Sequence, residues 1–259
     1  MIAVFSRENP HIKAAVRLRS SAADRRALGS FFLEGFRLCA DALASGYAPQ
    51  ELFLTAAVRE KYDTSPLEQA AAQTFEITES VAQKLGDTQS PQGVFAVYRM
   101  QDARGKTQEF FRPGGHYIAL ESLQDPANLG ATARTAEALG FHGLLLSGGC
   151  DAWHPKALRA SMGALLRLPA LHTDDLPVAL HTCGLPCYAA VPDSSAPDLL
   201  SCDFSRGGVL AVGSEGHGLS PETISACGHQ ITIPMPGRAE SLNAAAAATI
   251  LMWEMVRKP

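Results

Sequence analysis

The chain has 259 residues, of which 46% are hydrophobic and 19% are charged, and its formal net charge at pH 7 is −4. This length fits one large domain or two modest ones, and the low charged fraction argues against an intrinsically disordered chain. The amino terminus lacks a basic stretch followed by a long apolar run, and the longest apolar run, residues 244–253, is too short to span a bilayer. We therefore expect a cytoplasmic protein that has no membrane partner.

The first hundred residues predict a compact α/β unit. Asn9 and Pro10 are typical of a helix start, and that helix is expected to continue to about Arg19. A further helix should end near Gly46, because glycine commonly follows a helix C-terminus. Short apolar strands are expected at residues 31–33, 51–55, 74–78 and 93–98, with helical segments between them.

Residues 101–115 are polar and contain three glycines and a proline. Such a shift in composition is typical of a linker. It divides the chain into an N-terminal domain, residues 1–100, and a C-terminal domain, residues 116–259.

The C-terminal domain alternates apolar strands with helices. Strands are expected at 117–121, 143–147, 186–191, 208–213 and 231–233, and helices at 129–139, 154–166 and 241–256. Such alternation predicts a parallel sheet that is covered by helices on both faces. Ligands of these sheets bind at the carboxyl ends of the strands, where the loops after Glu121, Gly213 and Ile233 lie.

The charge is unevenly distributed. Residues 1–37 contain seven basic and three acidic residues, a local charge of +4, so the rest of the chain carries −8. A basic segment on an acidic body is consistent with RNA contact at the N-terminus. A solvated helix face explains the same charges equally well, so charge alone leaves both interpretations open.

Six cysteines are scattered along a chain that is large enough to fold without disulfides. Cys183 and Cys187 have the spacing of one helical turn, but no second pair with metal-ligand spacing follows. We therefore expect reduced thiols rather than a zinc site.

Asn128 and Arg134 lie six residues apart, at the start and in the body of a predicted helix. The asparagine would cap free backbone amides, and the arginine would be a surface residue. The alternative is that Arg134 faces the strand ends and meets a phosphate or ribose of RNA. The two residues alone favour the simpler interpretation.

Residues 213–218, Gly-Ser-Glu-Gly-His-Gly, follow an apolar strand, so their glycines should form a tight turn with exposed backbone. The glycine spacing of a dinucleotide-binding loop is absent, which disfavours a Rossmann-type enzyme. No Gly-x-Ser-x-Gly sequence surrounds Ser214, which disfavours a hydrolase. Gly105-Lys106-Thr107 lacks the earlier glycine of a phosphate loop.

A third segment, Ile-Pro-Met-Pro-Gly at 233–237, is followed by Ser-Leu-Asn at 241–243 and an alanine-rich helix. The prolines stiffen the loop, and Ser241 is expected to cap the final helix with Asn243 in its first turn. A capped helix is enough to explain Ser241, whereas a cofactor site would add contacts from both segments.

These three segments together resemble the signature of the SpoU/TrmH family, the RNA ribose 2′-O-methyltransferases of the SPOUT class. Their order, spacing and chain position match over roughly the last 145 residues. One difference is Ser214, where the family usually has asparagine; serine is shorter but keeps a hydrogen-bonding group. The resemblance implies an α/β fold in which a knotted, parallel-sheet methyltransferase domain follows a smaller N-terminal α/β domain.

The resemblance also implies S-adenosylmethionine as cofactor, no metal, and a homodimer in which the arginine often completes the partner's site. The residues implied as catalytic are Arg134, Asn128, Glu215, Ser241 and Asn243. The residues implied as cofactor contacts are Gly213, Ser214, Glu215, Gly216, Ile233, Pro234, Met235, Ser241 and Leu242. Because a guanidinium is a poor proton acceptor, we expect Arg134 to stabilise the developing alkoxide and an adjacent phosphate.

The N-terminal domain more loosely resembles the family's RNA substrate-binding domain, a ribosomal-protein-like α/β fold. The matching segments are residues 9–13, 18–19, 32–35 and 91–94. The expected RNA contacts are Lys13, Arg17, Arg19, Arg25 and Arg26, together with Arg134 of the catalytic domain. These side chains would hold the RNA backbone, whereas bases or folded shape would give specificity.

The leading hypothesis is therefore an RNA 2′-O-methyltransferase, with ribosomal RNA favoured over transfer RNA because of the added domain. A catalytically idle RNA-binding or assembly protein on the same fold is disfavoured by the complete motif set. A different small-molecule enzyme is disfavoured by the missing nucleotide fingerprints. The sequence leaves open which RNA and nucleotide are modified, at which assembly stage, and in which subunit's site Arg134 acts.

Overall fold

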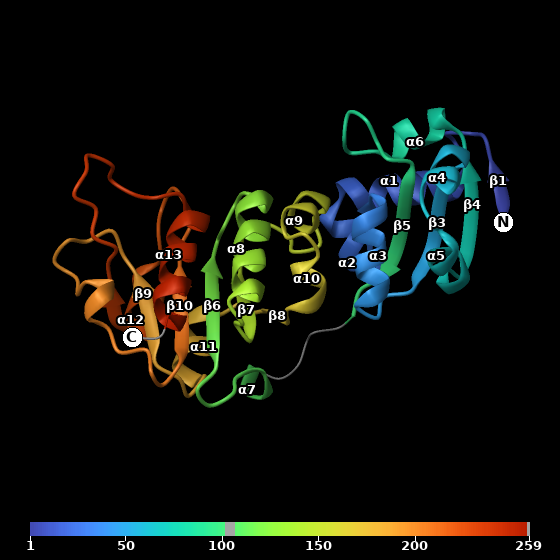
Figure 1. Cartoon of the computed structure of the whole chain (residues 1–259). Helices are drawn as coiled ribbons and strands as arrows, with labels where there is room; N and C mark the ends of the chain where they lie inside the picture. Colours follow the sequence, from blue (N-terminus) through green and yellow to red (C-terminus); the bar gives the residue numbers. More distant parts are fainter. Residues whose placement is uncertain (102–106, 258–259) are drawn as a thin grey trace. The chain divides into compact units, whose positions relative to one another are not determined.

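The computed structural model of the chain describes residues 1–101 and 107–257 (Figure 1). It forms two compact units. Unit 1 contains Met1–Gln101 and Trp153–Leu166, and unit 2 contains Asp102–Ala152 and Arg167–Pro259. Residues 102–106 of the predicted linker lie outside the described residues.

Unit 1 is built on a mixed five-stranded sheet with the order β1-β4-β3-β5-β2. Its strands are β1 (Ile2–Val4), β2 (Ser30–Glu34), β3 (Pro49–Thr55), β4 (Gln73–Ile77) and β5 (Val94–Arg99). Strand β4 pairs in parallel with β1 and β3, whereas β5 is antiparallel to β3 and β2. The four predicted strands are confirmed, and β1 escapes prediction because three residues are too few to show a pattern.

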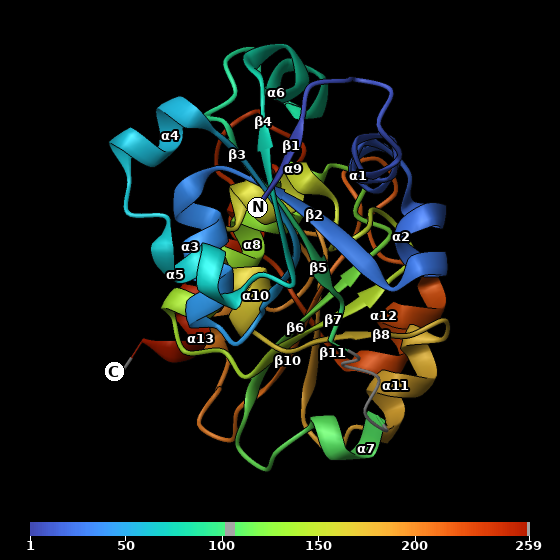
Figure 2. The ribbon, with the colours of Figure 1, turned by 90° about the vertical axis from the view of Figure 1, so that its right-hand side faces the viewer.

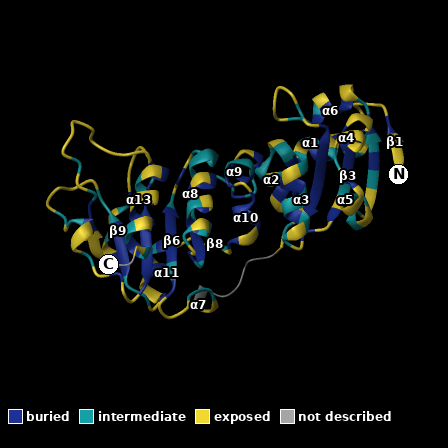
Figure 3. Ribbon diagram, viewed as in Figure 1, coloured by how far each residue is buried: buried dark blue, intermediate teal, exposed yellow. Residues whose placement is uncertain are grey.

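The helices of unit 1 cover both faces of this sheet. Those formed by residues 1–101 are α1 (Pro10–Ser20), α2 (Ala22–Leu28), α3 (Phe36–Ala44), α4 (Ala56–Lys61), α5 (Ser65–Ala70) and α6 (Glu79–Leu85). Figure 2 shows α1 on one side of the strands and α3 with α5 on the other. Asn9 caps α1 as predicted, because its side chain accepts a hydrogen bond from the His11 amide (2.9 Å). Figure 3 shows the strands as the most buried part of the unit, and Phe32, Phe53 and Phe75 lie in its core.

The predicted helix at 154–166 is instead two short helices, α9 (Pro155–Ala160) and α10 (Ala164–Arg167). The chain breaks between them because Met162 and Gly163 both adopt left-handed backbone angles, with φ of 50° and 84°. Trp153 attaches this segment to unit 1, since its ring centroid lies 4.6 Å from that of Phe31 on β2. The attachment joins residues that are more than a hundred positions apart, which local sequence patterns do not reveal.

Unit 2 contains a six-stranded sheet with the order β11-β9-β10-β6-β7-β8. Its strands are β6 (His116–Glu121), β7 (Gly143–Ser147), β8 (Ala170–His172), β9 (Cys187–Ala190), β10 (Gly208–Val212) and β11 (Gly228–Ile231). Every neighbouring pair in this sheet is parallel, which confirms the predicted sheet type. Strand β8 was not predicted, and β11 begins three residues before the strand expected at 231–233.

Two pairs of helices pack on this sheet. The helices of unit 2 are α7 (Thr107–Phe110), α8 (Pro126–Ala138), α11 (Leu176–Thr182), α12 (Pro221–Cys227) and α13 (Ala244–Val256), with a short 3₁₀ turn at Leu199–Ser201. Tyr117 and Ala119 of β6 pack in one cluster with α11 and α12. Because side chains alternate along a strand, Ile118 and Leu120 face the opposite side, where α8 packs against α13 (Figure 1). No helix among the described residues is long and apolar enough to cross a membrane.

Candidate functional site

The predicted motif loops follow strands that end at one edge of the parallel sheet. Strands β6 and β10 are direct neighbours, and Leu120 of β6 is in register with Val212 of β10. The loops after Glu121 and Val212 therefore leave the sheet side by side. Carboxyl ends of parallel strands are where α/β sheets bind ligands. The candidate site lies at this edge.

The glycine-rich loop after β10 closes on itself. The Ser214 amide donates to the Gly218 carbonyl (3.2 Å), and the Gly218 amide donates to the Ser214 carbonyl (3.0 Å). A Cβ atom on Gly213 would stand 2.0 Å from the Gly218 carbonyl carbon, so no larger residue fits without moving the loop. The turn is the tight one predicted from the glycines, and it leaves Glu215 and Gly216 exposed at its tip.

A relay of three side chains links this loop to two helices. The Asn128 amide nitrogen donates to Glu215, and the Asn128 amide oxygen accepts from the Asn243 side chain (3.2 Å). The Asn243 oxygen in turn accepts from the amides of Ala245 and Ala246 (3.0 and 3.2 Å). Three of the five predicted catalytic residues thus form one hydrogen-bonded set, although 87 and 115 positions separate Asn128 from its two side-chain partners.

Neither of the capping candidates, Asn128 and Ser241, caps its helix. Helix α8 begins at Pro126, and Asp125 caps it by accepting from the Ala127 amide (2.9 Å). Asn128 therefore lies inside the first turn, and its side chain is free to join the relay. Helix α13 begins at Ala244 with Asn243 as its cap, whereas Ser241 is exposed and forms no hydrogen bond with any described residue. Both errors arise because several good capping residues lie close together in the sequence.

Arg134 lies on the exposed surface of α8, six residues beyond Asn128. It forms no hydrogen bond or ion pair with the described residues, so its five N–H donors remain available. Helix α8 packs on α13, and the hydroxyls of Thr135 and Thr249 are 3.4 Å apart across that contact. Arg134 is therefore presented to solvent beside the α8–α13 pair and outside the relay.

The proline-containing loop after β11 offers apolar surface. Ile233 and Met235 are half-buried, while Pro234 and Leu242 are exposed, with 36% of Leu242 accessible. Leu242 immediately precedes Asn243, so this loop leads directly into the relay. Partly exposed aliphatic side chains next to polar groups suit a ligand that has a flat apolar ring and charged ends.

Sequence reasoning missed Glu121, the last residue of β6. Its carboxylate accepts hydrogen bonds from Ser220, which follows the glycine-rich loop, and from Thr223 of α12. The only signal in the sequence is an acidic residue at the end of an apolar strand, which many strands share.

The predicted RNA contacts of unit 1 are only partly accessible. Arg25 is buried, and its guanidinium donates to the carbonyls of Leu18 and Arg19 (2.6 and 3.1 Å). Arg19 donates to the carbonyls of Leu85 and of neighbouring residues at the C-terminal end of α6. These two arginines stabilise the fold, because buried carbonyls at helix ends need donors. The expectation that Arg25 grips RNA is therefore wrong.

The remaining three predicted RNA contacts of unit 1 lie at its surface. Lys13 is exposed but forms an ion pair with Glu8 (2.7 Å). Arg17 and Arg26 are exposed. A surface ion pair of this kind is weak, so Lys13 can exchange Glu8 for a phosphate at little cost.

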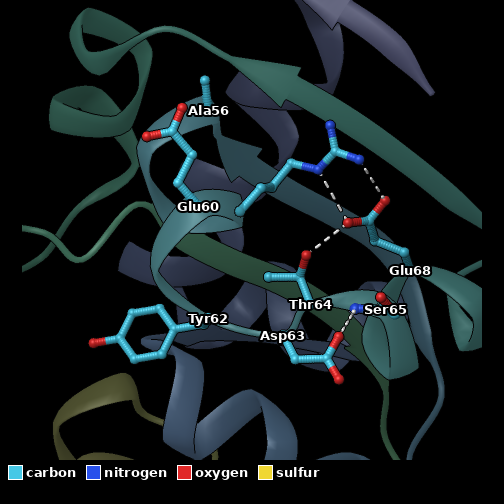
Figure 4. Close-up of a pocket in the computed structure, with 8 residues that line it drawn as sticks. Ala56, Glu60, Tyr62, Asp63, Thr64, Ser65 and Glu68 are labelled. Carbon is cyan, nitrogen blue, oxygen red and sulfur yellow. Dashed lines mark hydrogen bonds and ion pairs between the residues drawn. The ribbon is translucent and has the colours of Figure 1, made fainter.

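Two cavities lie elsewhere in the molecule. One of about 430 Å³ in unit 1 is lined by α4 and α5; its Arg59 is already bound to Glu68 (3.1 Å), which also accepts from Thr64 (Figure 4). The other, of about 860 Å³, lies between β11 and the segment around residues 193–203. Neither is lined by a predicted site residue, so the geometry of the strand ends, rather than cavity size, identifies the site.

The cysteine pair lies at the other end of the strands. Cys183 follows α11 and Cys187 begins β9, so they do not share a helix as their spacing suggested. Their sulfur atoms are 3.4 Å apart, and all six cysteines are free thiols. The Cys187 thiol lowers the pKa of Cys183 below that of an ordinary thiol by hydrogen bonding to it. Among the described residues no group of three metal-ligating side chains is found.

Both parts of the chain match models of known protein families. Residues 115–253 match the family described as SpoU rRNA Methylase, and residues 9–96 match the MRM3-like substrate binding domain. An uncharacterized tRNA/rRNA methyltransferase of Synechocystis is 34% identical over 98% of this chain and 93% of its own length. The 23S rRNA (uridine(2479)-2'-O)-methyltransferase of Streptomyces viridochromogenes is 30% identical over 90% of this chain and 85% of its own length.

A solved structure agrees with these sequence matches. The AdoMet-bound rRNA methyltransferase from Sinorhizobium meliloti superposes with a TM-score of 0.86 at 29% identity, covering 98% of this chain and 96% of that chain. The similarity extends over both units, so it includes the strand ends that carry the relay. The chain belongs to the SpoU rRNA methylase family.

Proposed function

We propose that this protein transfers a methyl group from S-adenosylmethionine to a ribose 2′-hydroxyl of ribosomal RNA. The observation that carries the proposal is the relay of Glu215, Asn128 and Asn243 at the strand ends, in a chain of the SpoU rRNA methylase family. The named activity of the Streptomyces viridochromogenes relative, 2'-O-methylation of 23S rRNA, supports the same chemistry here.

The residues at the strand ends fit S-adenosylmethionine, which supplies an electrophilic methyl group on a cationic sulfur. The exposed carboxylate of Glu215 suits a positively charged ligand. The partly exposed side chains of Ile233, Met235 and Leu242 suit a purine ring, and the loop backbone at 213–216 can hold polar groups of the ligand. Pro234 and Ser241 complete the proposed contact set.

Arg134 is the residue that we assign to the ribose oxygen. A 2′-hydroxyl is a very weak acid, so negative charge that develops on its oxygen must be stabilised. A guanidinium stays protonated, offers five donors and is not engaged by any described residue. Asn128 and Asn243 do not act on the ribose oxygen directly in this proposal. They hold the start of α13 and the glycine-rich loop in place.

We also propose that the protein is a homodimer. Helix α13 exposes Ile250 (40%) and Trp253 (57%) three positions apart, and therefore on one face. Large exposed apolar side chains next to each other mark contact surfaces. Arg134 lies on α8, the helix packed against α13, so a second copy that covers this face would come close to it. The proposed site is then shared between subunits.

The domain assignment is part of the proposal. Residues 1–100 would bind RNA, residues 116–259 would carry the methyltransferase site, and residues 101–115 would link them. Family membership supports a C-terminal segment that is threaded into a knot. The exposed Lys13, Arg17 and Arg26 would contact the RNA backbone.

The test is methyl transfer from labelled S-adenosylmethionine to unmodified ribosomal and transfer RNA, assayed separately. The RNA would be digested and its nucleosides identified by mass. A 2′-O-methyl nucleoside from ribosomal RNA is the expected result. The same product from transfer RNA alone would change the substrate, and a methylated base would overturn the reaction. Cofactor binding without transfer to either pool would support the idle RNA-binding protein.

A further inference from the structure

Glu121 accepts three hydrogen bonds at the end of β6. Its Oε2 accepts a hydrogen bond from the Ser220 amide (2.8 Å). Its Oε1 accepts from the Ser220 hydroxyl (2.8 Å) and from the Thr223 hydroxyl (2.7 Å). Hydrogen bonds to a carboxylate are shorter and stronger than neutral ones. Three of them on one half-buried group form a rigid connection between β6 and the start of α12.

The connection acts on the end of the glycine-rich loop. Ser220 follows that loop directly and caps α12, because its hydroxyl also accepts from the Thr223 amide (3.2 Å). The loop is already fixed where it leaves β10, which pairs with β6, and at its tip, where Glu215 accepts from Asn128. Leu219 at its exit is buried in the same apolar cluster as Tyr117 and Ala119 of β6, but among the described residues no other hydrogen bond ties this exit to β6. Glu121 therefore supplies the third fixed point of a loop whose glycines provide little stiffness of their own.

The backbone around Glu121 supports this role. Ser122, the next residue, has φ of 54°, a left-handed conformation that non-glycine residues rarely adopt. Its amide donates to the Ser147 carbonyl of β7 (2.7 Å). The chain thus turns sharply away directly after Glu121, and the carboxylate stays at the sheet edge facing Ser220. Strained backbone of this kind persists where the surrounding structure holds it in place.

We infer that Glu121 is a positioning residue for the cofactor loop: it holds the exit of the segment 213–219 so that Glu215 and the loop backbone face the ligand. The identity of the ligand rests on the proposed function, whereas the contact between Glu121 and the loop exit is independent of it. Glu121 bonds only to Ser220 and Thr223 among the described residues, so it would act through the loop rather than on substrate.

The experiment compares the wild type with Glu121→Gln, Ser220→Ala and the double variant. Glutamine keeps the size of the side chain but places an amide donor where one carboxylate oxygen accepted a bond. Glu137→Gln is the matched control. Both carboxylate oxygens of Glu137 also accept hydrogen bonds, in this case from Arg167, but Glu137 lies at the C-terminal end of α8. Hydrogen exchange of the ligand-free protein, resolved by peptide mass, reports on residues 213–220, and titration calorimetry gives the Kd for S-adenosylmethionine.

Glu121→Gln should accelerate exchange of the loop amides by about tenfold or more, since local opening exposes them. It should raise the Kd for S-adenosylmethionine by about tenfold. Glu137→Gln should alter neither quantity, even if it lowers the melting temperature. Because Glu121 and Ser220 act through one contact, the effects of the double variant should be smaller than the sum of the single effects.

Unchanged loop exchange in Glu121→Gln would overturn the inference, and so would a fall in melting temperature with unaltered exchange and Kd. Failure of the proposed function looks different. In that case the wild type would not bind S-adenosylmethionine, whereas the loop of Glu121→Gln would still lose its protection. Ser220→Ala keeps the test valid if Glu121→Gln does not fold, because it removes one donor from the other side of the same contact.

Discussion

Asn128 uses both ends of its amide group. The nitrogen donates to Glu215 of the glycine-rich loop, and the oxygen accepts from Asn243 at the start of α13. An amide donates from its nitrogen and accepts at its oxygen, whereas aspartate here would place two carboxylates together and leucine would break both bonds. A single side chain thereby joins three segments of the chain.

Arg134→Ala should lower kcat by about a hundredfold, which corresponds to roughly 3 kcal/mol of lost transition-state stabilisation. The arginine is exposed and unpaired with described residues, so the variant should fold normally and bind S-adenosylmethionine with unchanged affinity. Single-turnover kinetics and calorimetry measure the two quantities. Arg26→Ala, an exposed arginine of unit 1, is the control, and it should affect RNA affinity alone. A near-normal kcat in Arg134→Ala would remove this residue from the mechanism.

Cys183 should react with iodoacetamide at lower pH than the other buried thiols. Hydrogen bonding from Cys187 lowers the pKa of Cys183, whereas burial raises the pKa of Cys39 and Cys227 to about 12. Because the thiolate is the reactive form, the rate at Cys183 should rise at a lower pH than the rates at Cys39 and Cys227. Peptide mass mapping follows each site. In Cys187→Ala the rise should shift to higher pH; the same profile in both proteins would contradict this cause.

At the scale of elements, the ends of helices and loops decide the geometry of the site. The body of α13 is evident from its alanines, which are strong helix formers. Its first residue is decided by whichever nearby side chain reaches the free amides, and Asn243 does so while Ser241 does not. Moving the start of this helix from residue 241 to residue 244 changes which side chain caps it and which is available to contact a ligand.

Asn243→Ala should reduce the free energy of unfolding by about 1 kcal/mol, because α13 loses its cap. It should also weaken S-adenosylmethionine binding through loss of the contact with Asn128. Ser241→Ala is the matched comparison and should leave stability unchanged, since Ser241 bonds to no described residue. Urea unfolding gives the free energy of unfolding of both variants. Equal destabilisation by the two variants would mean that Ser241 shares the capping role.

Gly213→Ala should disrupt the glycine-rich loop, since its Cβ would stand 2.0 Å from the Gly218 backbone. We expect a loss of about 1–3 kcal/mol in stability from overpacking and at least about a tenfold rise in the Kd for S-adenosylmethionine. Gly237→Ala is the control, because Gly237 is not a proposed cofactor contact and a Cβ there meets nothing within 4 Å. If both variants bind the cofactor equally well, the close approach at Gly213 has no functional role.

At the scale of the whole molecule, the exposed face of α13 predicts self-association. Trp253→Glu should convert the proposed dimer into monomers, because a charge replaces a large apolar side chain that is 57% exposed in one copy. Val178→Glu changes a residue of similar exposure (56%) on α11 and should leave the assembly intact. Sedimentation velocity separates the two outcomes. A wild-type protein that sediments as a monomer at all concentrations would contradict the proposed dimer.

The sequence by itself determined the chemistry and the order of the elements. Continuous apolar strands, a glycine-rich turn and the Asn128–Arg134 spacing are local patterns, and local patterns record burial and backbone conformation directly. They were sufficient to predict the parallel sheet and the edge where a ligand site is expected, whereas the family came from the resemblance of the three segments to a known signature. That resemblance also implied Glu215, Asn128 and Asn243 as site residues, and the structure shows that these three are hydrogen-bonded to one another.

Only the tertiary structure decided which of these residues meet and which basic residues are free. Glu121 finds Ser220 across 99 positions, Trp153 joins α9 to unit 1, and Arg25 is buried against carbonyl groups instead of facing RNA. An arginine in the sequence is compatible with either a surface or a buried position. Packing settles the difference, because a buried donor must find an acceptor and that acceptor can come from any part of the chain.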